Sequence, residues 1–86
     1  MILKYHKTFE KQFKKLQIKE RQKVVSAISK FVLYPEEKYL KNHALKGNLI
    51  GKRAISAGSD LRIIFEEINS YTLVIFLDPR ETQSSL

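Results

Sequence analysis

The first 35 residues predict one strand and two amphipathic helices. Residues 1–5 (MILKY) are rich in β-forming side chains and indicate a short first strand. Thr8 can cap a helix whose apolar stripe is formed by Phe9, Phe13 and Leu16. We expect a second helix over residues 20–33, with one buried face formed by Val24, Val25, Ile28, Phe31 and Val32. Pro35 ends this helix because the residue before a proline is pushed out of helical geometry.

Three further strands follow a connecting segment. Residues 36–48 are interpreted as this connection, with Leu40 and Leu45 turned into the core. Strands are expected over residues 50–57, 61–68 and 71–77, joined by short hairpin connections. Apolar and more polar side chains alternate along 61–68, which is typical of a strand with two different faces. The last strand is apolar on both faces, which predicts an interior position in the sheet.

The order β-α-α-β-β-β predicts an α+β fold with two N-terminal helices packed on one face of a small antiparallel-rich sheet. The 86 residues leave room for one domain, which we expect to span residues 1–86. The opposite face of this sheet carries no helix, and we expect Arg53 and Arg62 to emerge there. A functional site is therefore expected on that face.

Charge and composition narrow the class of function. Sixteen Lys and Arg against nine Asp and Glu give a net charge of +7, which favours RNA, DNA, ribosomes or acidic proteins as partners. The basic surface of the first helix, including Lys14 and Lys15, is either an RNA contact or a solvated face. The absence of cysteine excludes disulfides and thiolate chemistry. No apolar run approaches the ~20 residues of a membrane span, so we expect a cytoplasmic protein without a membrane partner.

Candidate chemistry is concentrated between residues 42 and 67 (NHALKGNLIGKRAISAGSDLRIIFEE). No metal-ligand spacing or nucleotide-binding loop is present, so we expect neither a metal nor a cofactor. Cleavage of RNA by its own 2′-hydroxyl needs only a base, an acid and positive charge beside the transition state. His43 could be the base or the acid, because histidine titrates near neutrality, and Asp60 could act as a base or orient His43. Arg62 could bind the phosphate.

Each candidate also has a plainer interpretation. His43 could be a surface residue of a loop, Asp60 a turn residue, and Arg62 one half of a salt bridge with a neighbour such as Glu66. His6 is expected to be structural. The tyrosines are expected in the core or at its rim rather than stacked on bases. Further candidate cations for RNA binding are Lys46, Lys52, Arg53 and Arg80.

The pattern K-N-H-x-L-K-G-x-L-x-G-x-R, followed by D-L-R-I-I-F, resembles the RelE/ParE superfamily of bacterial toxins and is most similar to its YafQ-type members. The resemblance covers nearly the whole chain and is most specific at residues 43–47 and 60–62. It implies a toxin of a type II toxin–antitoxin system that acts as a metal-independent, ribosome-dependent mRNA endonuclease and inhibits translation. The implied partners are a cognate antitoxin, the ribosome and mRNA.

The resemblance also implies roles for single residues. His43 and Asp60 match two members of the acid–base set of YafQ-like toxins, while Ser56 and Gln83 stand where further histidines of that set occur. Arg62 resembles the strand arginine of RelE-like toxins, and Arg80 loosely resembles a residue of their tail. Glutamine cannot transfer a proton, so Gln83 would position the substrate. The implied site is then either dominated by cations, as in RelE-like toxins, or weakened.

Two other functions stay open at this point. The ParE branch of the superfamily shares the fold and inhibits DNA gyrase. A catalytically weakened module would only bind the antitoxin or the ribosome, and Ser56 and Gln83 favour it. His43, Lys46 and Arg62 resemble the nuclease branch, which favours mRNA cleavage over gyrase inhibition.

Overall fold

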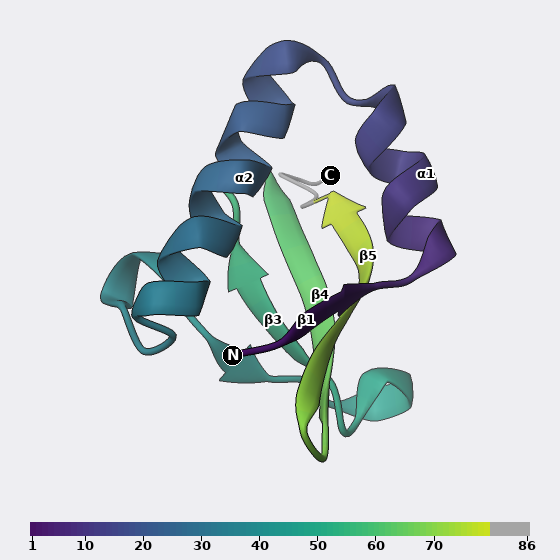
Figure 1. Cartoon of the computed structure of the whole chain (residues 1–86), viewed down its shortest axis with the longest axis vertical. Coiled ribbons are helices and arrows are strands. Elements are labelled where there is room, and N and C mark those ends of the chain that lie inside the picture. The colour runs from purple at the N-terminus through teal and green to yellow at the C-terminus, as the bar shows by residue number, and fades with distance from the viewer. Residues whose placement is uncertain (80–86) are drawn as a thin grey trace.

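A computed structural model describes residues 1–79 as two helices on one face of a five-stranded sheet (Figure 1). The helices are α1 (Lys7–Lys15) and α2 (Ile18–Leu33). The strands are β1 (Leu3–Tyr5), β2 (His43–Ala44), β3 (Arg53–Ser56), β4 (Leu61–Ile68) and β5 (Tyr71–Pro79). Two short 3₁₀ helices, η1 (Lys38–Leu40) and η2 (Gly47–Leu49), flank β2.

The strands lie in the order β1-β5-β4-β3-β2. β1 pairs with β5 in parallel, and every other neighbouring pair is antiparallel. The predicted α+β fold with an antiparallel-rich sheet is therefore confirmed. β5 lies between β1 and β4, so its predicted interior position is confirmed as well.

The hydrophobic core fills the space between the helices and the sheet. α2 contributes Val24, Ala27 and Phe31, while β4 contributes Leu61, Ile63 and Phe65. The rings of Phe31 and Phe65 lie 4.8 Å apart between centroids, which joins the second helix to the middle of the sheet. Alternate residues of β4 thus face the helices, as the period-two pattern predicts.

Gln12 of α1 fastens the first helix to β5. Its side-chain amide donates to the carbonyl of Leu77 at 2.9 Å, and the backbone N–H of Leu77 donates to its Oε1 at 2.6 Å. β1 pairs only with residues 72–74 of β5, so it does not reach Leu77. Gln12 therefore satisfies backbone groups that no strand covers on that edge.

The helix starts differ from the sequence prediction. α1 is capped by His6, whose Nδ1 accepts the backbone N–H of Thr8 at 3.0 Å, so Thr8 lies inside the helix and is not its cap. This contact gives His6 the structural role that was expected for it. α2 begins at Ile18, two residues earlier than predicted, and the N–H of Gln17 donates to Glu20 at 3.4 Å.

The buried face of α2 is narrower than predicted. Val24, Ala27 and Phe31 are buried, but Val25 and Val32 are 52% and 39% exposed, which contradicts the prediction that all five apolar residues share one buried face. Each of these two valines stands one position after a buried residue, about 100° further round the helix. Val25 instead lines a surface groove between α1 and α2.

The segment before β3 was also predicted incorrectly. Residues 36–48 are not only a connection, because His43 and Ala44 form β2 against β3. Pairing of β3 begins at Arg53 and not at residue 50, because turn hydrogen bonds hold the chain up to Lys52. Ile50 is 76% exposed, and Gly51 has a φ of +91°, a conformation that favours glycine. Leu40 is buried as expected, while Leu45 is only half-buried.

Candidate functional site

The face of the sheet opposite the helices brings together His43, Ser56, Arg62 and Asp78. Directly paired residues of neighbouring strands project to the same face of a sheet. Arg62 is paired with Ser56 on β3 and with Asp78 on β5, while His43 is paired with Ala54, two residues before Ser56. All four therefore lie opposite the core residues Leu61 and Ile63. We call this surface the open face.

The imidazole of His43 is oriented by the backbone of Lys41. Its Nδ1 lies 2.7 Å from the carbonyl oxygen of Lys41. A carbonyl oxygen can only accept a hydrogen bond, so Nδ1 carries a proton and donates it. In the neutral ring this leaves Nε2 unprotonated, and the side chain is exposed. His43 can therefore accept a proton from a substrate through Nε2.

Lys41, which supplies this carbonyl oxygen, has an uncommon backbone conformation. It ends η1 with φ 52° and ψ 44°, in the left-handed region that non-glycine residues seldom adopt. Its N–H donates to the carbonyl of Lys38, so the turn is fixed by its own hydrogen bond. Uncommon backbone conformations of this kind cluster at functional sites.

Arg62 is held by an ion pair with Asp78 on the neighbouring strand. Its terminal nitrogen donates to Oδ2 of Asp78, and the two side chains are 27% and 31% exposed. Its Nε is buried and has no hydrogen-bond partner among residues 1–79. The sequence suggested Glu66 as a salt-bridge partner of Arg62, and this choice of partner is wrong. Oε1 of Glu66 instead lies 3.9 Å from Nζ of Lys52. Arg62 thus keeps one donor for which the described residues supply no acceptor.

Asp60 and His43 are held by different parts of the molecule. The Oδ1 atom of Asp60 lies 3.6 Å from the ammonium of Lys23 on α2, beyond hydrogen-bonding distance. His43 uses its Nδ1 on the carbonyl of Lys41. The structure therefore gives no support to Asp60 as the group that orients His43. Asp60 instead ties the turn between β3 and β4 to α2.

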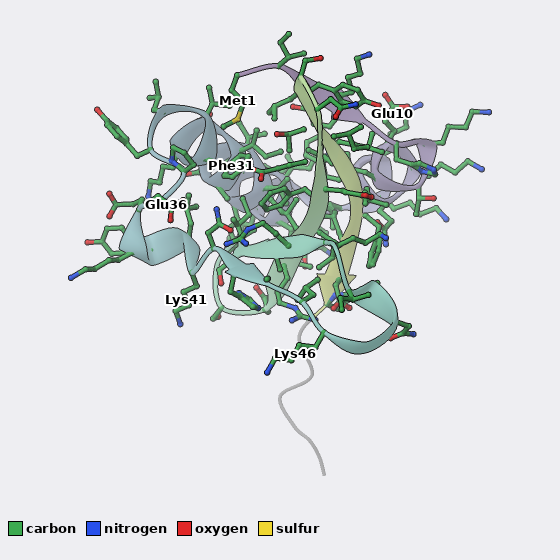
Figure 2. The ribbon with its side chains drawn as sticks, turned by 90° about the horizontal axis from the view of Figure 1, so that it is seen from below. Met1, Glu10, Phe31, Glu36, Lys41 and Lys46 are labelled. Atoms are coloured by element: carbon green, nitrogen blue, oxygen red, sulfur yellow. The ribbon has the colours of Figure 1, made fainter. Side chains whose placement is uncertain are left out.

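The predicted RNA-binding cations are spread over several surfaces. Arg53 is paired with the core residue Phe65 and so projects to the helix side, which contradicts its predicted place beside Arg62. Its Nε donates to Asn42 Oδ1 at 2.9 Å. Figure 2 shows Lys41 and Lys46 projecting outward on the same side of the molecule. Lys14 and Lys15 lie in the last turn of α1, on the helix side of the sheet and not on the open face.

Two predicted site residues lie outside the described part of the chain. Arg80 and Gln83 both follow residue 79, the last residue described. Within residues 1–79, no group of three or more His, Cys, Asp or Glu side chains is arranged to hold a metal ion. None of the helices described is long and apolar enough to cross a membrane.

Comparison with solved structures identifies the fold. The chain superposes on YafQ from E. coli strain BL21(DE3) with a TM-score of 0.77 at 17% identity, covering 91% of each chain. The chain has the RelE/ParE toxin fold. The E. coli DinJ–YafQ toxin–antitoxin complex gives a TM-score of 0.73 at 17% identity, covering 90% of this chain and 89% of the other.

A third similar structure comes from a different bacterium. The YoeB–YefM complex from Staphylococcus aureus gives a TM-score of 0.73 at 13% identity, covering 94% of this chain and 98% of the other. A scan against protein-family models found no match, and a search of curated proteins found no similar sequence. The likeness to toxins of the RelE/ParE fold is therefore carried by three-dimensional structure.

Three residues of the site were missed by the sequence analysis. Asp78 holds Arg62, Lys41 orients His43, and Lys23 lies against Asp60. Asp78 could not be found from a simple hairpin register, because the pairing that aligns Ile68 with Tyr71 would place Leu77 opposite Arg62. A β-bulge at Ile64/Phe65 shifts the register by one residue and brings Asp78 there instead. The contact of Lys41 with His43 involves a residue in the left-handed backbone region, and the contact of Lys23 with Asp60 brings a helix close to a turn. Neither arrangement can be predicted from a local sequence pattern.

Proposed function

We propose that this chain is the toxin of a type II toxin–antitoxin pair and cleaves mRNA on the ribosome. The proposal is supported by the fold, which the chain has in common with YafQ and YoeB. The observation that carries it is that His43 and Arg62 project from the same open face, and that Nε2 of the exposed His43 imidazole is free to accept a proton. We place this activity in the cytoplasm, where ribosomes and mRNA meet.

The open face supports cleavage by the RNA's own 2′-hydroxyl. Nε2 of His43 takes the proton of the 2′-hydroxyl, and the 2′-oxygen attacks the adjacent phosphorus. A 2′,3′-cyclic phosphate forms while the bond to the 5′-oxygen breaks, and we assign protonation of this leaving oxygen to water. Arg62 stabilises the negative charge of the transition state through its guanidinium. The resemblance assigns Arg80 to phosphate binding and Gln83 to substrate positioning.

The basic surface and the partners of similar toxins suggest an antitoxin for this chain. The solved relatives include toxins bound to DinJ and YefM. We propose that a cognate antitoxin of this chain carries an acidic segment that neutralises its net charge of +7. Binding of ribosome and mRNA would rest on phosphate contacts, which weaken as salt rises.

Primer-extension mapping of cellular mRNA after induced expression tests the nuclease. Wild type, His43→Ala and Arg62→Ala are compared, with Lys11→Ala as a control on the helix side of the molecule. We expect cuts within translated reading frames that disappear in both site variants and persist in the control. Growth arrest with intact mRNA would contradict the proposal and direct attention to gyrase, the target of the ParE branch.

The Arg62–Asp78 ion pair favours a second candidate function, a module that binds antitoxin or ribosome without cleaving RNA. Asp78 neutralises the cation that the nuclease needs, and Ser56 stands where the YafQ-type resemblance implies a histidine. Such a module would leave mRNA intact and growth unchanged in the same experiment. The two candidates therefore give opposite results in one assay.

A further inference from the structure

A basic cleft lies between α2, η1 and the turn from β3 to β4. The cleft is open to solvent and has a volume of about 700 Å³, within the size range of ligand-binding pockets. None of its lining residues is acidic, and its cations are Lys19, Lys23, Lys30 and Lys41. Among residues 1–79, only Lys23 of these four has a carboxylate partner, which is Asp60. We call this feature the lysine cleft. Its surplus of positive charge favours an anionic ligand.

One wall of the lysine cleft is an aromatic ring that faces solvent. Tyr39 lines the cleft and is 76% exposed, against the expectation that the tyrosines serve the core or its rim. The ammonium of Lys30 lies 5.3 Å from the centroid of this ring. A cation that can bind phosphate thus lies next to a ring that can stack on a base. Proteins that bind single-stranded nucleic acids combine these two elements.

The lysine cleft adjoins the open face. Lys41 lines the cleft, and its carbonyl oxygen orients the imidazole of His43. Ser56 also lines the cleft and is the direct register partner of Arg62 on β4. A strand whose scissile phosphate lies at His43 and Arg62 can therefore continue past Lys41 into the cleft.

We propose that the lysine cleft binds single-stranded RNA next to the bond that is cut. Lys19, Lys30 and Lys41 contact its phosphates, and one unpaired base stacks on Tyr39. This inference rests on the proposed RNA substrate and names a second part of its binding site. An acidic peptide would also satisfy the lysines, and it is therefore included as a competing probe in the test below. RNA is favoured because it uses both elements at once, its phosphates pairing with the lysines and an unpaired base stacking on the adjacent ring.

Binding of an RNA that cannot be cut tests this cleft separately from catalysis. The probe is a fluorescein-labelled octaadenylate with 2′-O-methyl groups, which lacks the attacking hydroxyl. Its affinity for the full chain carrying His43→Ala is measured by fluorescence anisotropy over a salt titration. Tyr39→Ala is compared with Tyr39→Phe, which keeps the ring, and with Tyr34→Ala, which removes a 65% exposed tyrosine outside the cleft. The Lys19→Gln/Lys30→Gln pair is compared with Lys7→Gln/Lys11→Gln on α1.

We expect Tyr39→Ala to weaken RNA binding about fivefold or more, because one stacked base is lost. Tyr39→Phe and Tyr34→Ala should bind the RNA as tightly as the parent protein. The cleft lysine pair should lower the slope of log affinity against log salt by about 1.4, since each single-strand phosphate contact contributes about 0.7. The α1 pair should leave that slope unchanged.

Three outcomes would overturn the inference. One is an unchanged affinity of Tyr39→Ala for the RNA probe. Another is an equal decrease of the salt-dependence slope in the cleft double variant and in the α1 double variant. The third is tighter binding of a labelled polyglutamate peptide than of the RNA, which would indicate a protein partner. Because the probe has no 2′-hydroxyl, none of these results bears on whether the protein cuts mRNA. Loss of the mRNA cuts in cells would likewise leave the binding result standing.

Discussion

Arg62 and Asp78 face each other across β4 and β5 and form an ion pair on the open face. The guanidinium of arginine offers several donors in a planar fork that matches phosphate as well as carboxylate. Asp78 engages a terminal nitrogen of that fork, while Nε is buried without an acceptor among residues 1–79. A phosphate that binds Arg62 must therefore either displace Asp78 or bind the other terminal nitrogen beside the negative charge of Asp78.

Removing the competing charge should raise activity. In Asp78→Asn we expect mRNA cleavage to rise about tenfold, because a charge-assisted hydrogen bond of roughly 1.5 kcal/mol no longer has to be displaced. The measurement is the single-turnover cleavage rate on programmed ribosomes. Glu67→Gln is the matched control, since it makes the same charge change at an exposed position away from the open face. A lower rate in Asp78→Asn would mean that Asp78 holds Arg62 in its working position.

The two histidines provide a matched pair for testing catalysis. His43→Asn should lower the cleavage rate about 100- to 10,000-fold, because an amide cannot accept the 2′-hydroxyl proton. His6→Asn should keep both the rate and the melting temperature, since asparagine is a good helix cap and can accept the N–H of Thr8. Both variants are assayed on ribosomes and melted by circular dichroism. Equal rates in wild type and His43→Asn would remove His43 from the mechanism.

Gln12 should matter for stability more than its place on a surface helix suggests. Gln12→Ala leaves the N–H and carbonyl of Leu77 without their side-chain partners, which should cost about 1–3 kcal/mol of unfolding free energy. Gln12→Glu should cost less than alanine, because the carboxylate can still accept from that N–H. Urea denaturation measures both, with exposed Lys11→Ala as the control. If Gln12→Ala lowers the unfolding free energy no more than Lys11→Ala does, water must replace the two hydrogen bonds to Leu77.

Alanine substitutions at two glycines can distinguish the cost of backbone strain from the cost of a side-chain clash. Gly51 and Gly58 have φ values of +91° and +79°, so an alanine at either should cost about 1–2 kcal/mol. A Cβ at Gly58 would also lie 2.9 Å from Cδ of Lys23, whereas one at Gly51 meets no atom within 4 Å. We expect Gly58→Ala to cost about 0.5–1.5 kcal/mol more, as Lys23 leaves its rotamer.

Repeating both glycine substitutions with Lys23→Ala isolates this contact. In that background the two alanines should destabilise the protein equally in urea denaturation. A difference that survives removal of Lys23 would locate the extra cost in the backbone of the turn.

Much of the fold could be predicted from periodicity. Alternation in residues 61–68 and the apolar run from Tyr71 identified β4 and β5, because a half-buried or interior strand needs those patterns. The two helices followed from stripes at helical spacing, although Val25 shows that such a stripe does not fix how wide the buried face is. β2 was missed because two residues, His43 and Ala44, are too few to show a period.

The candidate site was less predictable, since its geometry depends on pairing between distant residues. His43 and Arg62 could be proposed from the resemblance, and both lie on the open face. Arg53 could not be assigned correctly, because its face depends on the register with Phe65. The contact of Asp60 with Lys23 could not be foreseen, because Lys23 lies on a helix nearly forty residues earlier in the chain.

The parallel pairing of β1 with β5 affects how this protein is made. Leu3 is aligned with Thr72, so two of the most distant described segments must meet before the sheet is complete. β5 is also the last described strand to leave a translating ribosome, and it carries Asp78, the partner of Arg62. The nascent protein therefore lacks a finished open face until β5 has emerged. Under the proposed function, mRNA cleavage therefore begins only after the last described strand has emerged and paired with β4.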